Sequence, residues 1–249
     1  MKRKIMKIAT AVIGMGTLTT IMGLVITGRK IGWGPFAGLY DLSDEVKAIA
    51  RKYDVQECQH GIIFYGASNF RLWKEMENDL KGFKVQNHGF GGSTDKMLVK
   101  YADEILYPYH PDIVFLQTGS NDYVNLSGSD EEKVNMCMAF KKEMYEEFHE
   151  KLPETKFVVM SGLLLPGRSQ YTTLTQRINE SLKKLCDETE YLCFVDASDM
   201  TFDGTDYAEE LFISDGIHLN HKGQLRWCEE YIRPQIERMI KDVKETKDN

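Results

Sequence analysis

Four polar residues have side chains suited to acyl-transfer chemistry, and each follows an apolar run of the sequence. Ser68 comes after one such run and a glycine turn, and Asn121 comes after another. Asp215 and His218 are three residues apart in a glycine-containing turn, so the carboxylate can hold one imidazole nitrogen while the other stays free. An oriented imidazole can activate a serine hydroxyl, which is a poor nucleophile at neutral pH. These residues predict nucleophilic catalysis by Ser68.

The apolar runs alternate with longer amphipathic segments along the chain. The runs predict strands at 61–65, 83–86, 112–117, 156–160 and 191–195. The amphipathic segments predict helices at 41–53, 69–80, 95–105, 130–152, 173–188 and 220–243. This alternation implies an α/β fold with a five-stranded parallel sheet covered by helices on both faces. In such sheets the functional crevice lies at the carboxyl ends of the strands, so the four polar residues should converge there.

Each signal has a structural interpretation when it is taken alone. Small residues at 66–68 also make ordinary strand-to-helix turns, and an Asp-x-x-His turn is usually structural. Two other site types are disfavoured. The nucleophile elbow G-x-S-x-G needs a glycine at Phe70, and the dinucleotide fingerprint G-x-G-x-x-G needs one at Thr94. The signals therefore predict catalysis only because they occur together in one chain.

Four sequence blocks, in order, resemble those of the SGNH hydrolases, also called the GDSL esterase and lipase family, over residues 61 to 234. Gly-Ala-Ser at 66–68 resembles the nucleophile block, and Asn-x-Gly-x-x-Gly at 87–92 the glycine block. Gly-Ser-Asn-Asp at 119–122 resembles the asparagine block, and Asp-Gly-Ile-His at 215–218 the acid-base block. One departure is that the family's Gly-Asp-Ser has alanine in the middle here, which changes no triad atom.

Carried over by position, the resemblance implies Ser68 as nucleophile, His218 as base and Asp215 as the acid that orients the base. It implies an oxyanion hole formed by the Ser68 and Gly92 backbone N–H groups and the Asn121 side-chain amide. It further implies a flavodoxin-like three-layer α/β/α sandwich. We expect the reaction to need no metal and no cofactor.

The segments 68–73 and 218–223 are similar to the bacterial acylhydrolase branch of this family. We expect a serine esterase that removes a short acyl group, such as acetyl, from a carbohydrate or another small-molecule ester. The reason is that the candidate rim segments 123–130 and 167–172 are mostly polar or small. One alternative is a lysophospholipase-like acylhydrolase, since the leucines at 163–165 could line an acyl groove. The other is a non-catalytic carbohydrate- or lipid-binding protein on the same scaffold.

The composition argues against several other classes of protein. The 249 residues carry a net charge of −7 with no basic stripe, so we expect no nucleic-acid partner. The five cysteines are scattered and the histidines do not cluster, so we expect no structural zinc site.

Residues 1–30 predict an uncleaved signal anchor. Four basic residues precede an uncharged run at 8–28, and two follow it. The run reaches the roughly 20 residues that span a bilayer and is longer than the apolar core of a signal peptide. The run therefore predicts a single transmembrane helix at the cell membrane. The charge bias predicts a cytoplasmic N-terminus, which places the catalytic domain outside the cytoplasm. Secretion after cleavage is the alternative. The remaining segments are predicted as a linker and lead-in helix (31–58), the hydrolase domain (59–243) and a polar tail (244–249).

Overall fold

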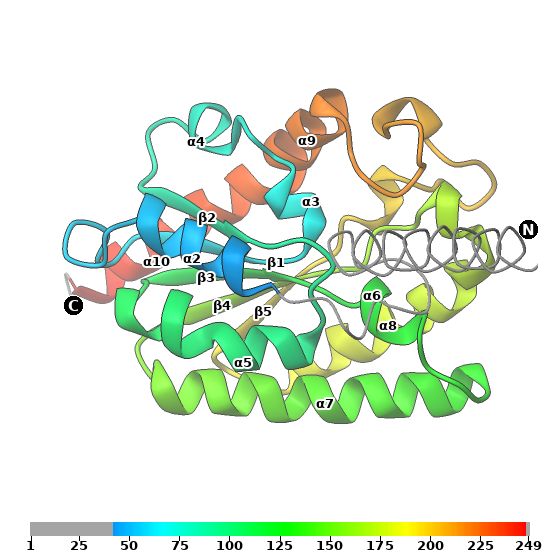
Figure 1. The fold of residues 1–249 in the computed structure, drawn as a ribbon, viewed down its shortest axis with the longest axis horizontal. Helices are drawn as coiled ribbons and strands as arrows, with labels where there is room; N and C mark the ends of the chain where they lie inside the picture. Colours follow the sequence, from blue (N-terminus) through cyan, green and yellow to red (C-terminus); the bar gives the residue numbers. More distant parts are fainter. Residues whose placement is uncertain (1–41, 248–249) are drawn as a thin grey trace, which may run out of the picture. The chain divides into compact units, whose positions relative to one another are not determined.

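The computed structural model describes residues 42–247, and a five-stranded parallel sheet forms its centre (Figure 1). The strands lie in the order β2-β1-β3-β4-β5. Their bounds are β1 Ile62–Gly66, β2 Val85–Gly89, β3 Ile113–Gln117, β4 Lys156–Met160 and β5 Leu192–Val195. The prediction of an α/β fold with five parallel strands is confirmed.

The helices lie between successive strands, except for the first, which precedes β1, and the last two, which follow β5. In chain order they are α2 (Ser43–Lys52), α3 (Ser68–Arg71), α4 (Met76–Asp79), α5 (Asp95–Ile105), α6 (Ser120–Tyr123), α7 (Asp130–Lys151), α8 (Thr172–Asp187), α9 (His221–Trp227) and α10 (Arg233–Lys247). Short 3₁₀ segments are η2 (Tyr107–Tyr109), η3 (Pro166–Tyr171), η4 (Ser198–Met200) and η5 (Glu209–Leu211), and η6 (Cys228–Ile232) is a π-helical turn.

Helices cover both faces of the sheet, with α5 and α7 on one side and α3 and α9 on the other (Figure 1). Successive strand residues point to opposite faces, and β1 shows this in its aromatic contacts. Phe64 stacks on Phe115 of β3 at 4.8 Å and meets Phe70 of α3 edge-on at 5.2 Å. Tyr65 points the other way, and its ring centre lies 6.1 Å from that of Phe148 in α7. The sheet is therefore the middle layer between two helical layers.

The predicted single helix at 69–80 is wrong. The structure has two short helices there, α3 and α4, separated by a break. In the break, the Trp73 ring turns inward and is 1% exposed, and its Nε1 donates to the Asp79 carboxylate at 2.6 Å. This hydrogen bond fixes the direction of the chain between the two helices. It cannot be predicted from the helical spacing of apolar residues.

Two further boundaries differ from the predictions. Strand β2 runs over Val85–Gly89 instead of 83–86, because its pairing with β1 continues to the Gly66–Gly89 register pair. The helix predicted at 220–243 is interrupted by the π turn η6. Where α9 meets this turn, the consecutive side chains Trp227 and Cys228 are both fully buried.

No helix within residues 42–247 is long and apolar enough to span a membrane. The predicted anchor at 1–30 lies outside the described residues, so it stays a prediction. The predicted domain boundaries, at 30/31, 58/59 and 243/244, also stay predictions.

Candidate active site

The candidate nucleophile lies where the strand order reverses. Strands β1 and β3 are neighbours in the sheet, and the chain leaves them toward opposite edges, which opens a crevice at their carboxyl ends. Ser68 is the first residue of α3, directly after β1. The Ala67 N–H donates to the Gln117 carbonyl oxygen at 3.1 Å, and a Cβ at Gly66 would come within 2.4 Å of that oxygen. Glycine at 66 therefore lets the two strand ends approach and brings Ser68 beside the residues after β3.

The structure brings the three predicted triad side chains into one hydrogen-bonded chain. The His218 ring contacts Ser68 Oγ through Nε2 at 2.8 Å and Asp215 Oδ2 through Nδ1 at 2.6 Å. Because an ionised carboxylate can only accept, Nδ1 carries the proton and Nε2 accepts from the serine hydroxyl. The His218 side chain is 22% exposed, so an ester can reach it from solvent. Serine, imidazole and carboxylate have the arrangement that activates a serine nucleophile.

The Asp215 carboxylate stabilises the acid-base turn in which it lies. Asp215 Oδ1 accepts from the Ile217 N–H at 2.8 Å and from the His218 N–H at 3.0 Å. Gly216 has a φ of +64°, and a Cβ there would lie 2.7 Å from the Gly167 nitrogen, so the turn requires glycine. Partial burial opposes ionisation of Asp215, but hydrogen bonds from His218 and Ile217 outweigh it and lower the pKa of the carboxyl group. The carboxylate therefore stays charged while it orients the imidazole.

Potential donors to an oxyanion surround Ser68. Within residues 42–247, the backbone N–H groups of Ser68 and Gly92 donate no hydrogen bond. The glycine block that contains Gly92 lies against β1, since Ser93 Oγ donates to the Gly66 carbonyl oxygen at 3.3 Å. The Asn121 side-chain Nδ2 donates to the Ser93 carbonyl oxygen at 3.0 Å. The second and third blocks thus meet beside the end of β1.

A small hollow of about 20 Å³ lies next to the nucleophile. Its walls come from Ala67, Ser68, Asn69, Gln117, Thr118, Gly119, Ser120, Asn121 and Ile217. A larger hollow of about 300 Å³ lies elsewhere, between α2 and the α3–α4 segment, and contains no triad residue. Among the side chains that the structure describes, no group of three His, Cys, Asp or Glu residues could hold a metal ion.

A buried ionic network lies beneath the asparagine block. Lys141 of α7 is 1% exposed, and its Nζ donates to the Asp95 carboxylate at 3.0 Å and to Thr118 Oγ1 at 2.8 Å. Asp122 Oδ1 accepts from the Asp95 N–H at 3.0 Å. Burial and the nearby Asp95 carboxylate raise the pKa of Asp122 to about 7. Burial opposes the charge of Lys141, but the two carboxylates outweigh it and raise the lysine pKa. The network ties the loops of the candidate oxyanion donors to α7.

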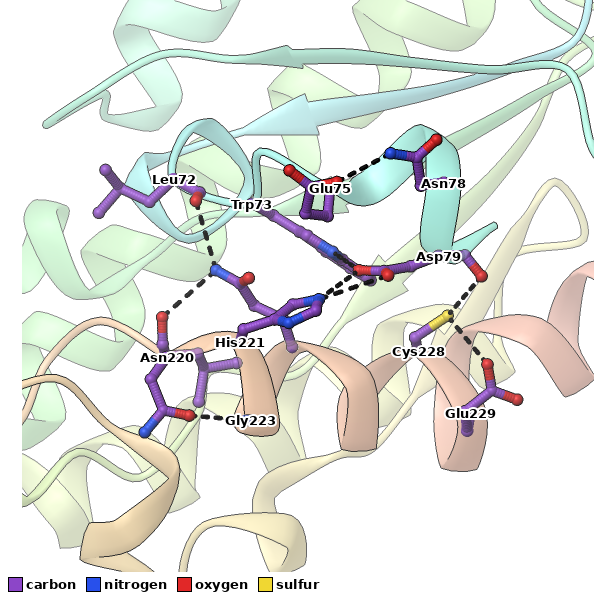
Figure 2. Close-up of polar contacts among 12 residues, drawn as sticks. Leu72, Trp73, Glu75, Asn78, Asp79, Asn220, His221, Gly223, Cys228 and Glu229 are labelled. Atoms are coloured by element: carbon purple, nitrogen blue, oxygen red, sulfur yellow. Dashed lines mark hydrogen bonds and ion pairs between the residues drawn. The ribbon is translucent and has the colours of Figure 1, made fainter. Parts of the chain in front are cut away.

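A second Asp-His contact, outside the triad, joins α4 to α9. The Asp79 carboxylate of α4 lies between Trp73 Nε1, at 2.6 Å, and His221 Nε2 of α9, at 3.2 Å (Figure 2). His221 is the histidine one turn after His218, and its side chain is 53% exposed. The contact ties the nucleophile side of the fold to the helix that begins after the acid-base turn.

The sequence placed Arg168 only within the candidate rim segment 167–172, and it gave no role in the site to Lys141 or Asp95. Arg168 donates to Asn121 Oδ1 across 47 positions of the sequence, and Lys141 reaches Asp95 across 46. None of the three belongs to a motif or has a local partner that would mark it. Only the fold shows that they contact the candidate oxyanion loops.

A parallel sheet of this order, with a serine, a histidine and an aspartate in contact at its switch point, has the architecture of a serine hydrolase. The chain belongs to the GDSL-like lipase/acylhydrolase family, whose sequence model matches residues 62–226. The family resemblance found in the four sequence blocks is thereby confirmed, and the protein is an enzyme that hydrolyses ester bonds. No curated protein sequence matches the chain.

Solved structures with a similar fold include three esterases or lipases. A GDSL-like lipase from Bacteroides thetaiotaomicron has a TM-score of 0.57 at 19% identity, covering 79% of this chain and 96% of its own. An acetyl esterase has a TM-score of 0.56 at 17% identity, covering 74% and 99%. An acetyl-xylooligosaccharide esterase from Geobacillus Stearmophilus has a TM-score of 0.52 at 16% identity, covering 68% and 90%. At these identities the similarity establishes the shared fold.

Proposed function

We propose that this acylhydrolase is a serine esterase that works through a triad of Ser68, His218 and Asp215. The observation that carries the proposal is the double contact of the His218 ring, at 2.8 Å to Ser68 Oγ and 2.6 Å to Asp215 Oδ2. A structural histidine on the surface does not need both partners, whereas a general base needs one to orient it and one to deprotonate.

The proposed reaction runs in two halves. Ser68 Oγ attacks the ester carbonyl carbon while His218 Nε2 takes the hydroxyl proton, and the carbonyl oxygen becomes an oxyanion. The alcohol then leaves with that proton, and the acyl group remains on Ser68. Water attacks the acyl-enzyme in the same way, with His218 accepting its proton and returning it to the serine oxygen as the carboxylic acid departs.

The oxyanion in both halves would be stabilised by three donors. These are the Ser68 and Gly92 backbone N–H groups, which have no other partner in the described part of the chain, and the Asn121 amide. Ser68 also lies at the N-terminus of α3, where unpaired N–H groups favour negative charge. No cofactor is required by this mechanism.

We propose a short acyl group, acetyl first, as the group removed. The hollow next to Ser68 is about 20 Å³, far below the roughly 300–1,000 Å³ of pockets that enclose drug-sized ligands. Leu163, Leu164 and Leu165 after β4 are 3%, 3% and 6% exposed, so they pack in the core and do not offer an open acyl groove. Two of the similar structures are acetyl esterases, one acting on acetylated xylooligosaccharide, which agrees with an O-acetyl carbohydrate substrate.

A chain-length series of p-nitrophenyl esters tests the acyl group. We expect kcat/KM to be highest for acetate and to fall as the acyl chain lengthens, and we expect acetate release from acetylated polysaccharide. If kcat/KM instead rises from acetate to laurate, the short-acyl proposal is wrong and a lysophospholipase-like activity takes its place.

We further propose that residues 1–30 anchor the protein in the cell membrane with the catalytic domain outside the cytoplasm. Support comes from the uncharged run at 8–28 and the excess of basic residues before it. Cell fractionation with an antibody to the C-terminal region tests this proposal. Full-length protein in the membrane fraction supports the anchor, and released protein that lacks the first 30 residues would replace it by a cleaved signal peptide.

A further inference from the structure

Arg168 reaches the candidate oxyanion hole from the segment after β4. Its Nη1 donates to Ser120 Oγ at 2.6 Å, and Nη1 and Nη2 both donate to Asn121 Oδ1, at 3.4 and 3.3 Å. The side chain is partly buried, and burial lowers the pKa of the guanidinium. No carboxylate among residues 42–241, whose side chains the structure describes, forms an ion pair with Arg168. Its hydrogen bonds go to two adjacent residues of the asparagine block instead.

These contacts determine which way the Asn121 amide faces. A guanidinium has only donors, so the amide must present its oxygen to Arg168. The opposite end, Nδ2, then faces the Ser93 carbonyl oxygen at 3.0 Å. The flipped amide would set its NH₂ group against the guanidinium and its oxygen against the Ser93 carbonyl, and it would lose its hydrogen bonds to both neighbours. Both neighbours therefore favour the orientation that keeps Nδ2 on the Ser93 side.

The segment that carries Arg168 is itself fixed to the acid-base turn. The Gly167 N–H donates to the Gly216 carbonyl oxygen at 2.9 Å. A Cβ at Gly167 would come within 2.3 Å of the Asp215 carbonyl oxygen, so only glycine permits this approach. The arginine next to Gly167 is thereby held between the acid-base turn on one side and the oxyanion side of the site on the other.

We infer that Arg168 is a positioning residue that orients the Asn121 amide so that its Nδ2 can donate to the oxyanion. This inference rests on the proposed esterase function. Arg168 itself need not touch the substrate, because its effect passes through Asn121. Preorganised donors contribute to catalysis only when they already point at the developing charge, so an amide free to flip would be a weaker donor.

Steady-state kinetics with p-nitrophenyl acetate tests this role. For Arg168→Gln we expect kcat to fall about tenfold, a part of the roughly 10²–10³ that one oxyanion donor supplies, with KM changed less than about twofold. Arg177→Gln is the matched control, because Arg177 is an exposed arginine of α8 with no side-chain contact to the site. A higher KM at unchanged kcat in Arg168→Gln would overturn the inference and make Arg168 a substrate contact.

The Asn121→Ala background gives the sharper comparison. If Arg168 acts through Asn121, Arg168→Gln changes kcat less than about twofold once the amide is gone, because coupled residues are not additive. A double variant whose loss equals the product of the two single losses would show that Arg168 acts independently, and the inference would fail.

A third readout does not depend on turnover. In ¹⁵N-correlated NMR spectra, the side-chain NH₂ signals of Asn121 can be assigned by their loss in Asn121→Ala. We expect these signals to shift or broaden in Arg168→Gln and to stay in place in Arg177→Gln. Unmoved signals would refute the positioning role, even if the wild-type enzyme hydrolysed no tested ester and the proposed function itself were wrong.

Discussion

Asn69 Oδ1 accepts a hydrogen bond from the Leu219 backbone N–H at 3.1 Å, and both residues are buried. Asn69 follows Ser68 and Leu219 follows His218, so this bond joins the immediate neighbours of nucleophile and base. It bridges the same 150 positions of sequence as the contact between the Ser68 hydroxyl and the His218 ring. The distance between nucleophile and base is therefore supported by a bond that takes no part in the chemistry.

Asn69→Ala removes the acceptor and leaves the Leu219 N–H buried without a partner. We expect a destabilisation of about 1–3 kcal/mol and a lower kcat at nearly unchanged KM, because the base is less well placed against Ser68. Urea unfolding and p-nitrophenyl acetate kinetics measure the two effects. Asn69→Asp keeps an acceptor oxygen and should retain more kcat than Asn69→Ala. Equal kcat in wild type and Asn69→Ala would show that the bond has no role in placing the pair.

Ser68→Ala and His218→Ala should each reduce esterase turnover nearly to background. Nucleophile and base act as one unit, so the double variant should be little worse than either single variant. Initial rates of all three variants against wild type test this, with circular dichroism to show that each is folded. A double variant that shows the product of the two single effects would contradict a shared mechanism.

The fold and the four sequence blocks could be predicted from the sequence because both depend on local patterns of residues. Short apolar runs such as 112–117 and 156–160 alternate with amphipathic segments, and parallel strands then bring their carboxyl ends to one edge of the sheet. Ser68 and Asn121 closely follow β1 and β3, so they could be placed together from the strand pattern. His218 lies well beyond the end of β5, and its pairing with Ser68 was expected from the family resemblance.

Side chains that support the site could not be predicted in this way. Lys141 and Lys142 are identical neighbours on α7, yet the first side chain is 1% exposed and the second is 63% exposed. What separates them is the Asp95 carboxylate, which the fold brings to Lys141 and which makes burial of its charge tolerable. Trp73 is similar, because its contact with Asp79 breaks a segment whose spacing predicts one continuous helix. Contacts of this kind, which form only in the folded protein, produce no recognisable pattern in the local sequence.

Lys141→Met should destabilise the protein by about 3–5 kcal/mol, because it leaves the Asp95 carboxylate buried without its cation. Lys142→Met is the control: that lysine is exposed and its nearest carboxylate lies at 3.9 Å, so its loss should cost less than about 1 kcal/mol. Urea unfolding measures both. Combining Lys141→Met with Asp95→Asn should restore part of the lost stability. Equal effects of the two single lysine variants would contradict the buried network.

The raised pKa of Asp122 predicts that the stability of the folded protein depends on pH. Burial and the Asp95 carboxylate raise its pKa to about 7, so between about pH 4 and 7 the folded state holds a proton that the unfolded state has released. Stability from this group therefore falls as pH rises through that range. Asn at 122 cannot ionise, so the Tm of Asp122→Asn minus that of wild type should increase from pH 4 to pH 7.

The exposed residue Asp103 on α5 provides the comparison for this measurement. Asp103→Asn makes the same change in charge at the surface, and its Tm difference from wild type should stay nearly constant over the same range. If the two variants gave parallel profiles, the pH dependence assigned to Asp122 would be wrong.

The most direct measurement for the central claim is reaction of the protein with a fluorophosphonate, followed by peptide mass spectrometry and by p-nitrophenyl acetate hydrolysis on the same samples. A triad that activates Ser68 predicts one phosphonyl group on the Ser68 peptide, loss of hydrolysis in proportion to labelling, and no labelling in Ser68→Ala or His218→Ala. Wild-type protein that is neither labelled nor active would contradict catalysis by Ser68 and favour a non-catalytic binding protein on this scaffold. Labelling and hydrolysis that persist in Ser68→Ala would place the nucleophile elsewhere.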